Sequence, residues 1–133
     1  MIEVEGAPPL RAGACRVVAE AGANHNNSVE RAIEMAVRAA ESGAWGVKYQ
    51  LYKADSLVVR NSPKYWQDDI GTATQFEAFK KSDHLDYSAY DDVFAACRDL
   101  GIVGFATPFD LAAVEALENA GTPIYKIASG DIT

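Results

Sequence analysis

Cysteine and histidine are scarce in this chain of 133 residues, and each shortage argues against a class of site. The two cysteines, Cys15 and Cys97, are far apart, form no CxxC pair and lie in apolar surroundings, so neither a disulfide framework nor a thiolate metal site is expected. We expect both to be buried, reduced thiols. The two histidines, His25 and His84, share no helical ligand spacing, so no metal site is expected from this chain alone.

Long apolar runs and an excess of positive charge are also missing. No run approaches the roughly 18 apolar residues of a membrane span, and residues 1–13 are acidic and proline-bearing rather than a basic and then apolar leader. We therefore expect a cytoplasmic protein without a membrane partner. Asp and Glu outnumber Lys and Arg by 19 to 12, a net charge of −7, which argues against a nucleic-acid surface. An anionic ligand would need a local cationic pocket.

The apolar residues that are present are spaced as strands that alternate with helices. The expected strands span residues 16–22, 45–52, 102–109 and 123–129. The expected helices begin after Asn27 or Ser28, after Ser88 and after Asp110. Residues 53–86 have no sustained period, so we expect a long ordered loop there, with one helical turn at most. Loops of this length in compact domains often act as lids or binding segments.

This alternation predicts an α/β fold with a parallel sheet and right-handed crossovers. Two architectures fit the pattern, an open doubly wound sheet and a closed eight-fold barrel. A barrel needs roughly 250 residues, so this chain would supply about half of one, with about four strands and three helices. On the barrel interpretation, residues 1–15 are a lead-in and residues 16–133 are a partial barrel truncated after its fourth strand, either a fragment or one piece of an assembly.

Each expected strand ends in a polar cluster, and binding groups gather at the carboxyl ends of parallel strands. The clusters contain Glu20, Asn24 and His25, then Lys48 and Gln50, then Thr107, and finally Lys126, Ser129 and Asp131. A single strand lysine often only reaches past the sheet to water. Two of them, Lys48 and Lys126, in strands expected to be buried on both faces, would need an anion such as a phosphate or a carboxylate. The sequence therefore predicts a site for a small, doubly anionic metabolite.

Glu20 and the run from Asn24 to Asn27 have structural as well as functional interpretations. A carboxylate inside an apolar strand is expected to be buried with a partner, and Lys48 on the next strand is the natural one. The asparagines can cap the following helix or line the site, and neither interpretation is favoured. His84 lies among charged residues of the long loop and is expected to be solvated.

Four motifs, AEAGANHN, VKYQLYKADSLV, ATPFD and YKIASGDIT, occur in this order between about Val17 and Thr133. Together they resemble the N-terminal half of the catalytic barrel of the sialic acid (N-acetylneuraminate) synthase family. The resemblance implies the N-terminal portion of a (β/α)8 TIM barrel, from an enzyme that condenses phosphoenolpyruvate with an N-acetylmannosamine-type sugar. It also implies a divalent metal, Mn or Mg, with ligands outside this chain, and a homo-oligomer such as a dimer.

Roles for individual residues follow from the same motifs. The resemblance implies that Lys48, Thr107, Lys126 and Ser129 hold phosphoenolpyruvate, that Gln50 faces the sugar, and that Glu20 organises the first strand end with Asn24 and His25 nearby. Glu20 and Asp131 are the expected catalytic carboxylates, with Asp131 managing protons at the condensing carbons. Many relatives have Glu at the position of Asp131. Asp is one methylene shorter, about 1.5 Å, which matters for direct proton transfer.

Alternatives stay open beside this interpretation. Pseudaminic and legionaminic acid synthases are close variants that differ in the sugar. Another phosphoenolpyruvate-condensing barrel, of the 3-deoxy-ulosonate synthase type, is not expected to carry EAGANHN and SGDIT together. A non-catalytic half-barrel would use its open sheet edges to bind another copy or another chain. Because the chain holds about half of an active site on the barrel interpretation, we expect it to be inactive by itself.

Overall fold

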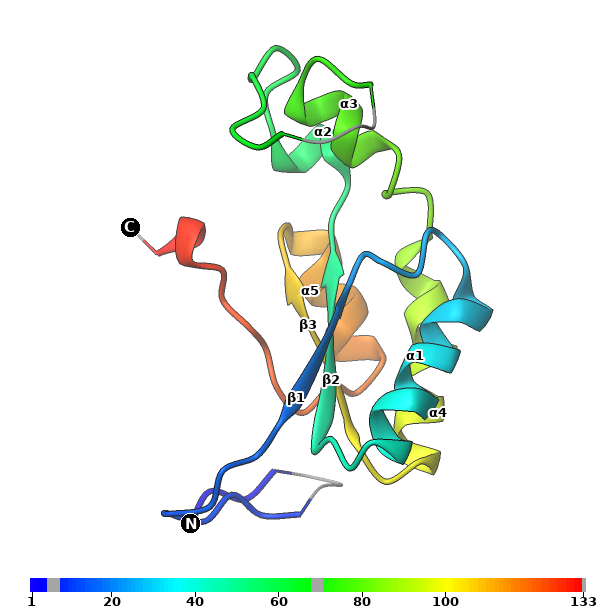
Figure 1. Ribbon diagram of the computed structural model, residues 1–133, viewed down its shortest axis with the longest axis vertical. Helices are drawn as coiled ribbons and strands as arrows, with labels where there is room; N and C mark the ends of the chain where they lie inside the picture. The colour runs from blue at the N-terminus through cyan, green and yellow to red at the C-terminus, as the bar shows by residue number, and fades with distance from the viewer. Residues whose placement is uncertain (5–7, 68–70, 133) are drawn as a thin grey trace.

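The computed structural model describes residues 1–4, 8–67 and 71–132, and it contains a three-stranded parallel sheet. The strands are β1 (Val18–Gly22), β2 (Gly46–Leu51) and β3 (Val103–Pro108), in the order β1-β2-β3. Figure 1 shows them side by side with their carboxyl ends at the same edge of the sheet. The α/β class and the first three expected strands are confirmed.

Three longer helices follow the three strands, as the apolar spacing predicts. They are α1 (Val29–Glu41), α4 (Tyr90–Asp99) and α5 (Leu111–Asn119). Ser28 caps α1 by accepting a hydrogen bond from the backbone N–H of Arg31 at 3.1 Å, and Asp110 caps α5 by accepting from that of Ala113 at 2.8 Å. Both caps were expected from the sequence.

The core lies between these helices and one face of the sheet. In β2, Val47, Tyr49 and Leu51 are at most 1% exposed and belong to the main apolar cluster, while Lys48 and Gln50 alternate with them. Because successive strand residues point to opposite faces, Lys48 and Gln50 point away from the helices. The fold therefore separates an apolar face from a face that carries polar side chains.

The prediction of a fourth strand over residues 123–129 is wrong. Tyr125 forms one parallel bridge to Ala106, and the Lys126 N–H donates to the Ala106 carbonyl at 3.1 Å, but no strand continues from there. Instead the chain turns into a 3₁₀ helix, η2 (Ser129–Asp131), and Figure 1 shows this segment leaving the sheet. A strand gains its stability from pairing and from burial of its side chains, whereas Lys126 and Ile127 are exposed.

The segment between β2 and α4 holds more structure than the single turn expected. It contains α2 (Ala54–Leu57), α3 (Gln75–Lys80) and the 3₁₀ helix η1 (Tyr87–Ala89). A capping box starts α3, because Thr74 accepts from the Glu77 N–H and Glu77 accepts from the Thr74 N–H. The sequence carries this T-x-x-E signal at residues 74–77, so α3 could have been predicted.

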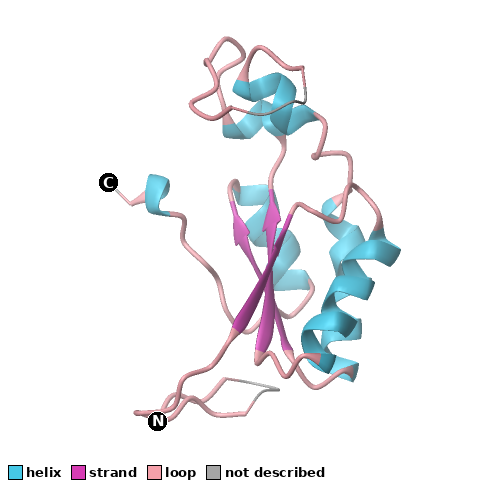
Figure 2. Cartoon of the chain, in the orientation of Figure 1, coloured by secondary structure: helices cyan, strands magenta, loops and turns pink. Residues whose placement is uncertain are grey.

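The N-terminal residues pack under the amino end of the sheet. Ile2 pairs with Leu10 in an antiparallel bridge, and the indole N–H of Trp45 donates to the Pro8 carbonyl at 2.9 Å. Figure 2 shows this N-terminal loop below the strands. Cys15, which follows it, is exposed, so the expectation of burial is wrong there and confirmed for Cys97. Among the described residues, no helix is long and apolar enough to cross a membrane.

Candidate functional site

A lysine, a glutamate and a threonine meet near the carboxyl ends of the three strands. Glu20 is aligned with Lys48 across β1 and β2, and Thr107 of β3 is aligned with Gln50 of β2. The Lys48 Nζ lies 2.7 Å from Glu20 Oε2 and 3.0 Å from Oε1, and 3.5 Å from Thr107 Oγ1. We call Glu20, Lys48 and Thr107 the strand-end cluster.

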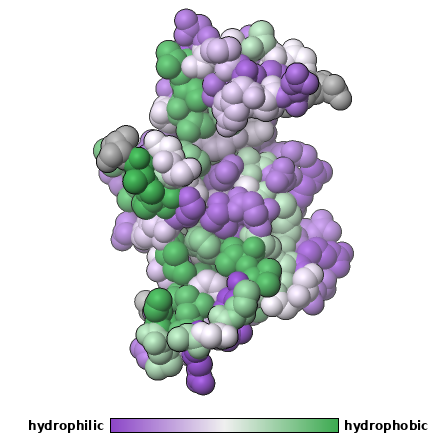
Figure 3. All heavy atoms as spheres, turned by 60° about the vertical axis from the view of Figure 1, so that its left-hand side comes forward, coloured by the Kyte–Doolittle hydropathy of each residue, from purple (hydrophilic) through white to green (hydrophobic). Residues whose placement is uncertain are grey.

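The cluster lies on the sheet face that the helices leave uncovered. Figure 3 views the molecule from the side of β1 and the C-terminal segment, and hydrophilic side chains cross its middle while hydrophobic ones gather below. The expected pairing of Glu20 with Lys48 is confirmed, but the expected burial of Glu20 is wrong. Its side chain, on β1 at one edge of the sheet, is 51% exposed, whereas that of Lys48 on the central strand is 16% exposed.

The backbone of β1 directs Glu20 toward its neighbours. The pairing register shifts between Glu20 and Gly22, and Gly22 has a φ of +56°, a region that side chains disfavour. A Cβ at Gly22 would lie 3.4 Å from Glu20 Oε1, and 3.7 Å from both Asn24 Nδ2 and Gln50 Oε1. Three of the expected site residues therefore meet around this glycine.

His25 lies in the core and not in the strand-end cluster. Its side chain is among those less than 2% exposed, its Nε2 is 2.9 Å from the Tyr90 hydroxyl, and its ring is tilted against that of Tyr49. Burial lowers the pKa of His25, because the charged imidazolium would lose its hydration. The Nδ1 atom has no hydrogen-bond partner among the described residues. The structure therefore brings Asn24, but not His25, to the expected site.

Lys126, Ser129 and Asp131 stay apart from the strand-end cluster. All three are exposed, and the Lys126 ammonium donates to the carbonyl of the adjacent Ile127. Within the described residues, no hydrogen bond or ion pair joins these side chains to Lys48 or Thr107. The two expected anion-binding lysines are thus on separate parts of the chain in this structure, and their common role stays a prediction.

A second set of polar contacts holds the segment between β2 and α4 over the strand ends. Asp83, whose carboxylate is buried, accepts from the Ala54 N–H at 2.9 Å and from the Lys80 ammonium at 3.1 Å. The Lys53 ammonium donates to the carbonyls of Asp83 at 2.7 Å and Leu85 at 3.0 Å. The Lys80–Asp83 pair is local, but the sequence gives no local signal for the contacts of Ala54 and Lys53, whose partners are 29 to 32 residues away.

Two more side chains tie the loops of neighbouring strands to this segment. Asn27 donates to the Lys81 carbonyl at 2.8 Å and accepts from the His84 N–H at 3.1 Å. Asp110, besides capping α5, accepts from Ser56 Oγ at 2.6 Å and from the Tyr87 hydroxyl at 2.8 Å. Sequence reasoning considered Asn27 as a capping or site-lining residue and Asp110 as a capping residue, and it missed these long-range contacts.

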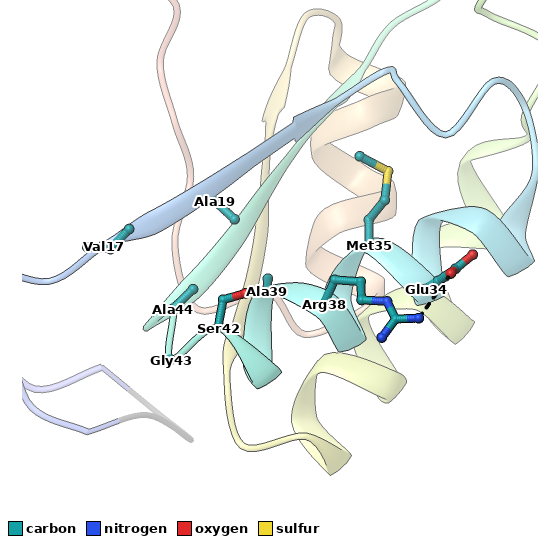
Figure 4. A pocket seen from close by; sticks show the side chains of 9 residues that line it. All are labelled: Val17, Ala19, Glu34, Met35, Arg38, Ala39, Ser42, Gly43 and Ala44. Carbon is teal, nitrogen blue, oxygen red and sulfur yellow. Dashed lines mark ion pairs between the residues drawn. The ribbon is translucent and has the colours of Figure 1, made fainter.

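Two of the hollows that border the sheet differ in their relation to the expected site. The first, of about 320 Å³, is lined by Gln50, Tyr52, Leu57, Val58, Tyr65, Gln75, Phe79 and Phe109. Gln50 also lies beside Gly22, so this aromatic hollow adjoins the strand-end cluster. The second, of about 570 Å³, lies between β1 and α1, where Figure 4 shows Val17, Met35 and the Arg38–Glu34 ion pair around it. It contains none of the expected site residues.

The described residues do not gather a metal-binding group. Nowhere in that part of the chain do three or more His, Cys, Asp or Glu side chains come together in a way that could hold an ion. The residues present therefore do not by themselves make the donor set that a divalent cation requires. The metal that the motifs imply stays a prediction.

A family comparison connects this site to known proteins. The model of the NeuB family matches residues 21–133, which include Lys48 and Thr107 of the strand-end cluster and the SGD segment. This chain belongs to the NeuB family. The resemblance inferred from the four motifs is thereby confirmed, and several relatives of this NeuB chain are named as legionaminic or pseudaminic acid synthases.

Relatives of known name cover nearly all of this NeuB chain. It is 37% identical over 124 residues to the N,N'-diacetyllegionaminic acid synthase of Legionella pneumophila, covering 90% of this chain and 34% of that protein. It is 34% identical to the pseudaminic acid synthase of Helicobacter pylori, over 88% of this chain and 35% of that one. This chain spans about a third of the length of these curated relatives.

The structure also matches a solved one. The N-acetylneuraminic acid (sialic acid) synthetase of Leptospira borgpetersenii has a TM-score of 0.70 and 25% identity, over 95% of this chain and 43% of that chain. The similarity in fold therefore extends over almost every element described above, including those that position the strand-end cluster.

Proposed function

We propose that this chain contributes the phosphoenolpyruvate-binding wall of a nonulosonate synthase. The observation that carries the proposal is the Lys48 ammonium, held between Glu20 and Thr107 at the strand ends of a NeuB-family chain. An ammonium at this place is suited to a phosphate, since a phosphate provides a strong negative charge and several acceptor oxygens. The neighbouring Thr107 hydroxyl adds a donor.

The proposed reaction joins phosphoenolpyruvate to the open-chain form of an N-acetylmannosamine-type sugar. C3 of the enol attacks the aldehyde carbon, water adds at C2, and phosphate leaves by cleavage of its C–O bond. Lys48, Thr107, Lys126 and Ser129 bind phosphoenolpyruvate in this proposal, and Asp131 moves protons at the condensing carbons. Gln50 and Asn24 face the sugar. A divalent metal, Mn or Mg, would supply Lewis acidity from ligands outside this chain.

The Lys126 ammonium, which contacts the Ile127 carbonyl, must turn toward Thr107 for this site to form. The single bridge between Ala106 and Tyr125 is the start of a parallel pairing next to β3, and it supports the proposal that residues 126–131 can align there. A further strand on the outer side would bury Ile127 and stabilise that alignment. Homo-oligomers such as dimers are part of the same proposal.

A chimeric enzyme tests the proposal. We would replace the aligned N-terminal third of the Legionella N,N'-diacetyllegionaminic acid synthase with this chain and measure phosphate release and the sugar-acid product. Lys126→Ala should raise the KM for phosphoenolpyruvate by about tenfold or more, the cost of a lost charged hydrogen bond, and leave that for the sugar nearly unchanged. Arg31→Ala, on an exposed part of α1, is the control for a lost positive charge.

The result can contradict the proposal in two ways. A folded chimera that releases no phosphate, while the parent synthase does, would remove the support for the reaction. An active chimera in which Lys126→Ala raises both KM values equally would refute the assignment of Lys126 to phosphoenolpyruvate.

A further inference from the structure

We infer that Glu20 is a displaceable counter-ion of Lys48. A bound phosphate takes its place on Lys48, and the released carboxylate turns toward Gln50 and Asn24. The inference rests on the proposed function, since the phosphate is that of phosphoenolpyruvate. It assigns Glu20 two alternative positions, one on the phosphate side of the site and one on the sugar side.

Each N–H of the Lys48 ammonium already has an oxygen neighbour. An ammonium has three N–H groups, and Lys48 Nζ has three oxygen neighbours, Glu20 Oε2 at 2.7 Å, Glu20 Oε1 at 3.0 Å and Thr107 Oγ1 at 3.5 Å. The Lys48 side chain is only 16% exposed, which leaves little room for a further partner. A phosphate that binds Lys48 directly must therefore displace one of these neighbours.

Glu20, rather than Thr107, is the neighbour that a phosphate displaces from Lys48. Thr107 is 2% exposed and lies inside β3, so its hydroxyl can turn but its side chain cannot move away. The Glu20 side chain is 51% exposed and stands on the outer strand at the register shift. Glu20 also carries the negative charge that a phosphate repels. Displacement of Glu20, with Thr107 kept as a phosphate donor, is the arrangement that the geometry favours.

The displaced carboxylate of Glu20 moves into the space around Gly22. Gln50 and Asn24 lie beside Glu20 around Gly22, whose missing Cβ leaves the space between the three side chains open. The Asn24 amide donates to the Ala21 carbonyl at 3.0 Å, whereas the Gln50 amide has no hydrogen bond within the described residues. The Gln50 atom nearest Gly22 is the acceptor Oε1, so a rotation of the Gln50 amide would bring its Nε2–H donors toward a released carboxylate. Glu20 then becomes an acceptor facing the same side as the sugar-binding residues.

The consequence is that Glu20 and phosphate compete for Lys48. A partly exposed ion pair contributes about 1 kcal/mol, which corresponds to about a fivefold change in a dissociation constant. Removing the carboxylate of Glu20 should thus strengthen phosphate binding by about fivefold. Removal of a residue that binds phosphate would instead weaken phosphate binding.

Calorimetric titration of the chain with phosphoenolpyruvate, and separately with inorganic phosphate, tests the competition. Glu20→Gln should bind both anions about fivefold more tightly than wild type. Glu34→Gln, an exposed carboxylate in the Arg38 ion pair on α1, removes the same charge far from Lys48 and should leave binding unchanged. Glu20→Asp keeps the charge but shortens the side chain, so it should also bind more tightly if competition rather than repulsion is the cause.

Backbone and side-chain amide signals in an NMR titration report the destination of Glu20. Phosphate should shift the side-chain amide signal of Gln50 in wild type but not in Glu20→Gln. The amide of Gln75, which donates to the Pro63 carbonyl at 2.8 Å, provides a reference signal that should stay in place.

The outcomes separate this inference from the proposed function. If wild type and Glu20→Gln bind phosphoenolpyruvate equally and Lys48→Met abolishes binding, the anion site stands and the displacement is refuted. If only Glu20→Gln strengthens binding and Glu20→Asp does not, simple repulsion replaces competition. If neither wild type nor Glu20→Gln binds either anion, the inference falls, whereas the proposed function is tested separately by phosphate release from the chimera.

Discussion

His25 is a polar side chain that the fold places among aromatic rings. It stands in the loop before α1, packs edge-on against Tyr90 and forms its hydrogen bond with the hydroxyl of that residue. The partners are 65 positions apart, so the sequence could not reveal their contact. The pairing of Glu20 with Lys48 was predictable because adjacent parallel strands align their residues. The exposure of Glu20 was not, since it depends on which strand lies outermost.

Burial of His25 predicts that the chain loses stability in mild acid. Because burial lowers the pKa of His25, the unfolded chain binds a proton near pH 6.5 while the folded chain stays neutral. The free energy of unfolding should therefore fall as the pH drops below about 6.5. Urea titrations at several values between pH 7.5 and 5.5 measure this as a declining midpoint. His25→Gln should remove most of the decline and His84→Gln should not; a decline unchanged by His25→Gln would contradict the assignment.

At the scale of elements, the apolar spacing predicted each unit that packs against the core. The first three strands and the three longer helices all bury a face that the sequence marks, such as Ala32, Ala36 and Ala39 on α1. The segment 123–129 has the composition of a strand but keeps only one bridge, because pairing and burial rather than local preference stabilise a strand. Local sequence signals therefore predicted these helices and strands but not which of them pair or pack together.

Asp110 connects three elements, and this predicts an unusually costly substitution. Its carboxylate caps α5 and also accepts from Ser56 of α2 and Tyr87 of η1. Burial raises the pKa of Asp110, but the hydrogen bonds from Ser56, Ala113 and Tyr87 outweigh burial and lower it. A carboxyl group whose pKa is lowered by folding stabilises the fold at any pH above its pKa in the unfolded chain, and this contribution is lost as the pH falls through its pKa in the folded chain. The contribution of Asp110 is therefore fully present at neutral pH.

Asp110→Ala should lower the free energy of unfolding by about 2 kcal/mol, since it removes a helix cap and two further hydrogen bonds to a charged group. Urea denaturation at pH 7 measures the loss. Ser28→Ala is the matched control, because Ser28 caps only α1, and it should cost about 1 kcal/mol. Equal losses in the two variants would mean that the contacts to Ser56 and Tyr87 contribute nothing to stability.

The molecule as a whole presents one wall of the proposed site. The motifs identified the NeuB family from the sequence, and the length estimate of half a barrel compares with about a third of the length of the curated relatives. The position of the Lys126 side chain could not be predicted from the sequence. It belongs to a segment that is joined to β3 by a single bridge, between Tyr125 and Ala106, and that forms no strand of the three-stranded sheet.

We expect the 133-residue chain to form no product with phosphoenolpyruvate, N-acetylmannosamine and Mn²⁺. Lys48 and Thr107 are in place, but Lys126 and Asp131 are exposed and apart from them. Catalysis needs its groups held within fractions of an ångström of the productive geometry. Phosphate release and mass spectrometry of the products measure the activity, with the chimeric synthase as the positive control. Robust product formation by the chain alone would show that the site is complete without further residues.

The contact made by Asn27 has a consequence for how this sequence can diverge. Asn27 holds the backbone carbonyl of residue 81 and the backbone N–H of residue 84, and it adopts a left-handed φ of 61° that asparagine tolerates well. Because these bonds go to backbone atoms, they do not depend on which side chain stands at position 81 or 84. Insertions or deletions between them would break both bonds. Homologues that keep Asn27 should therefore vary there in residue identity but not in spacing.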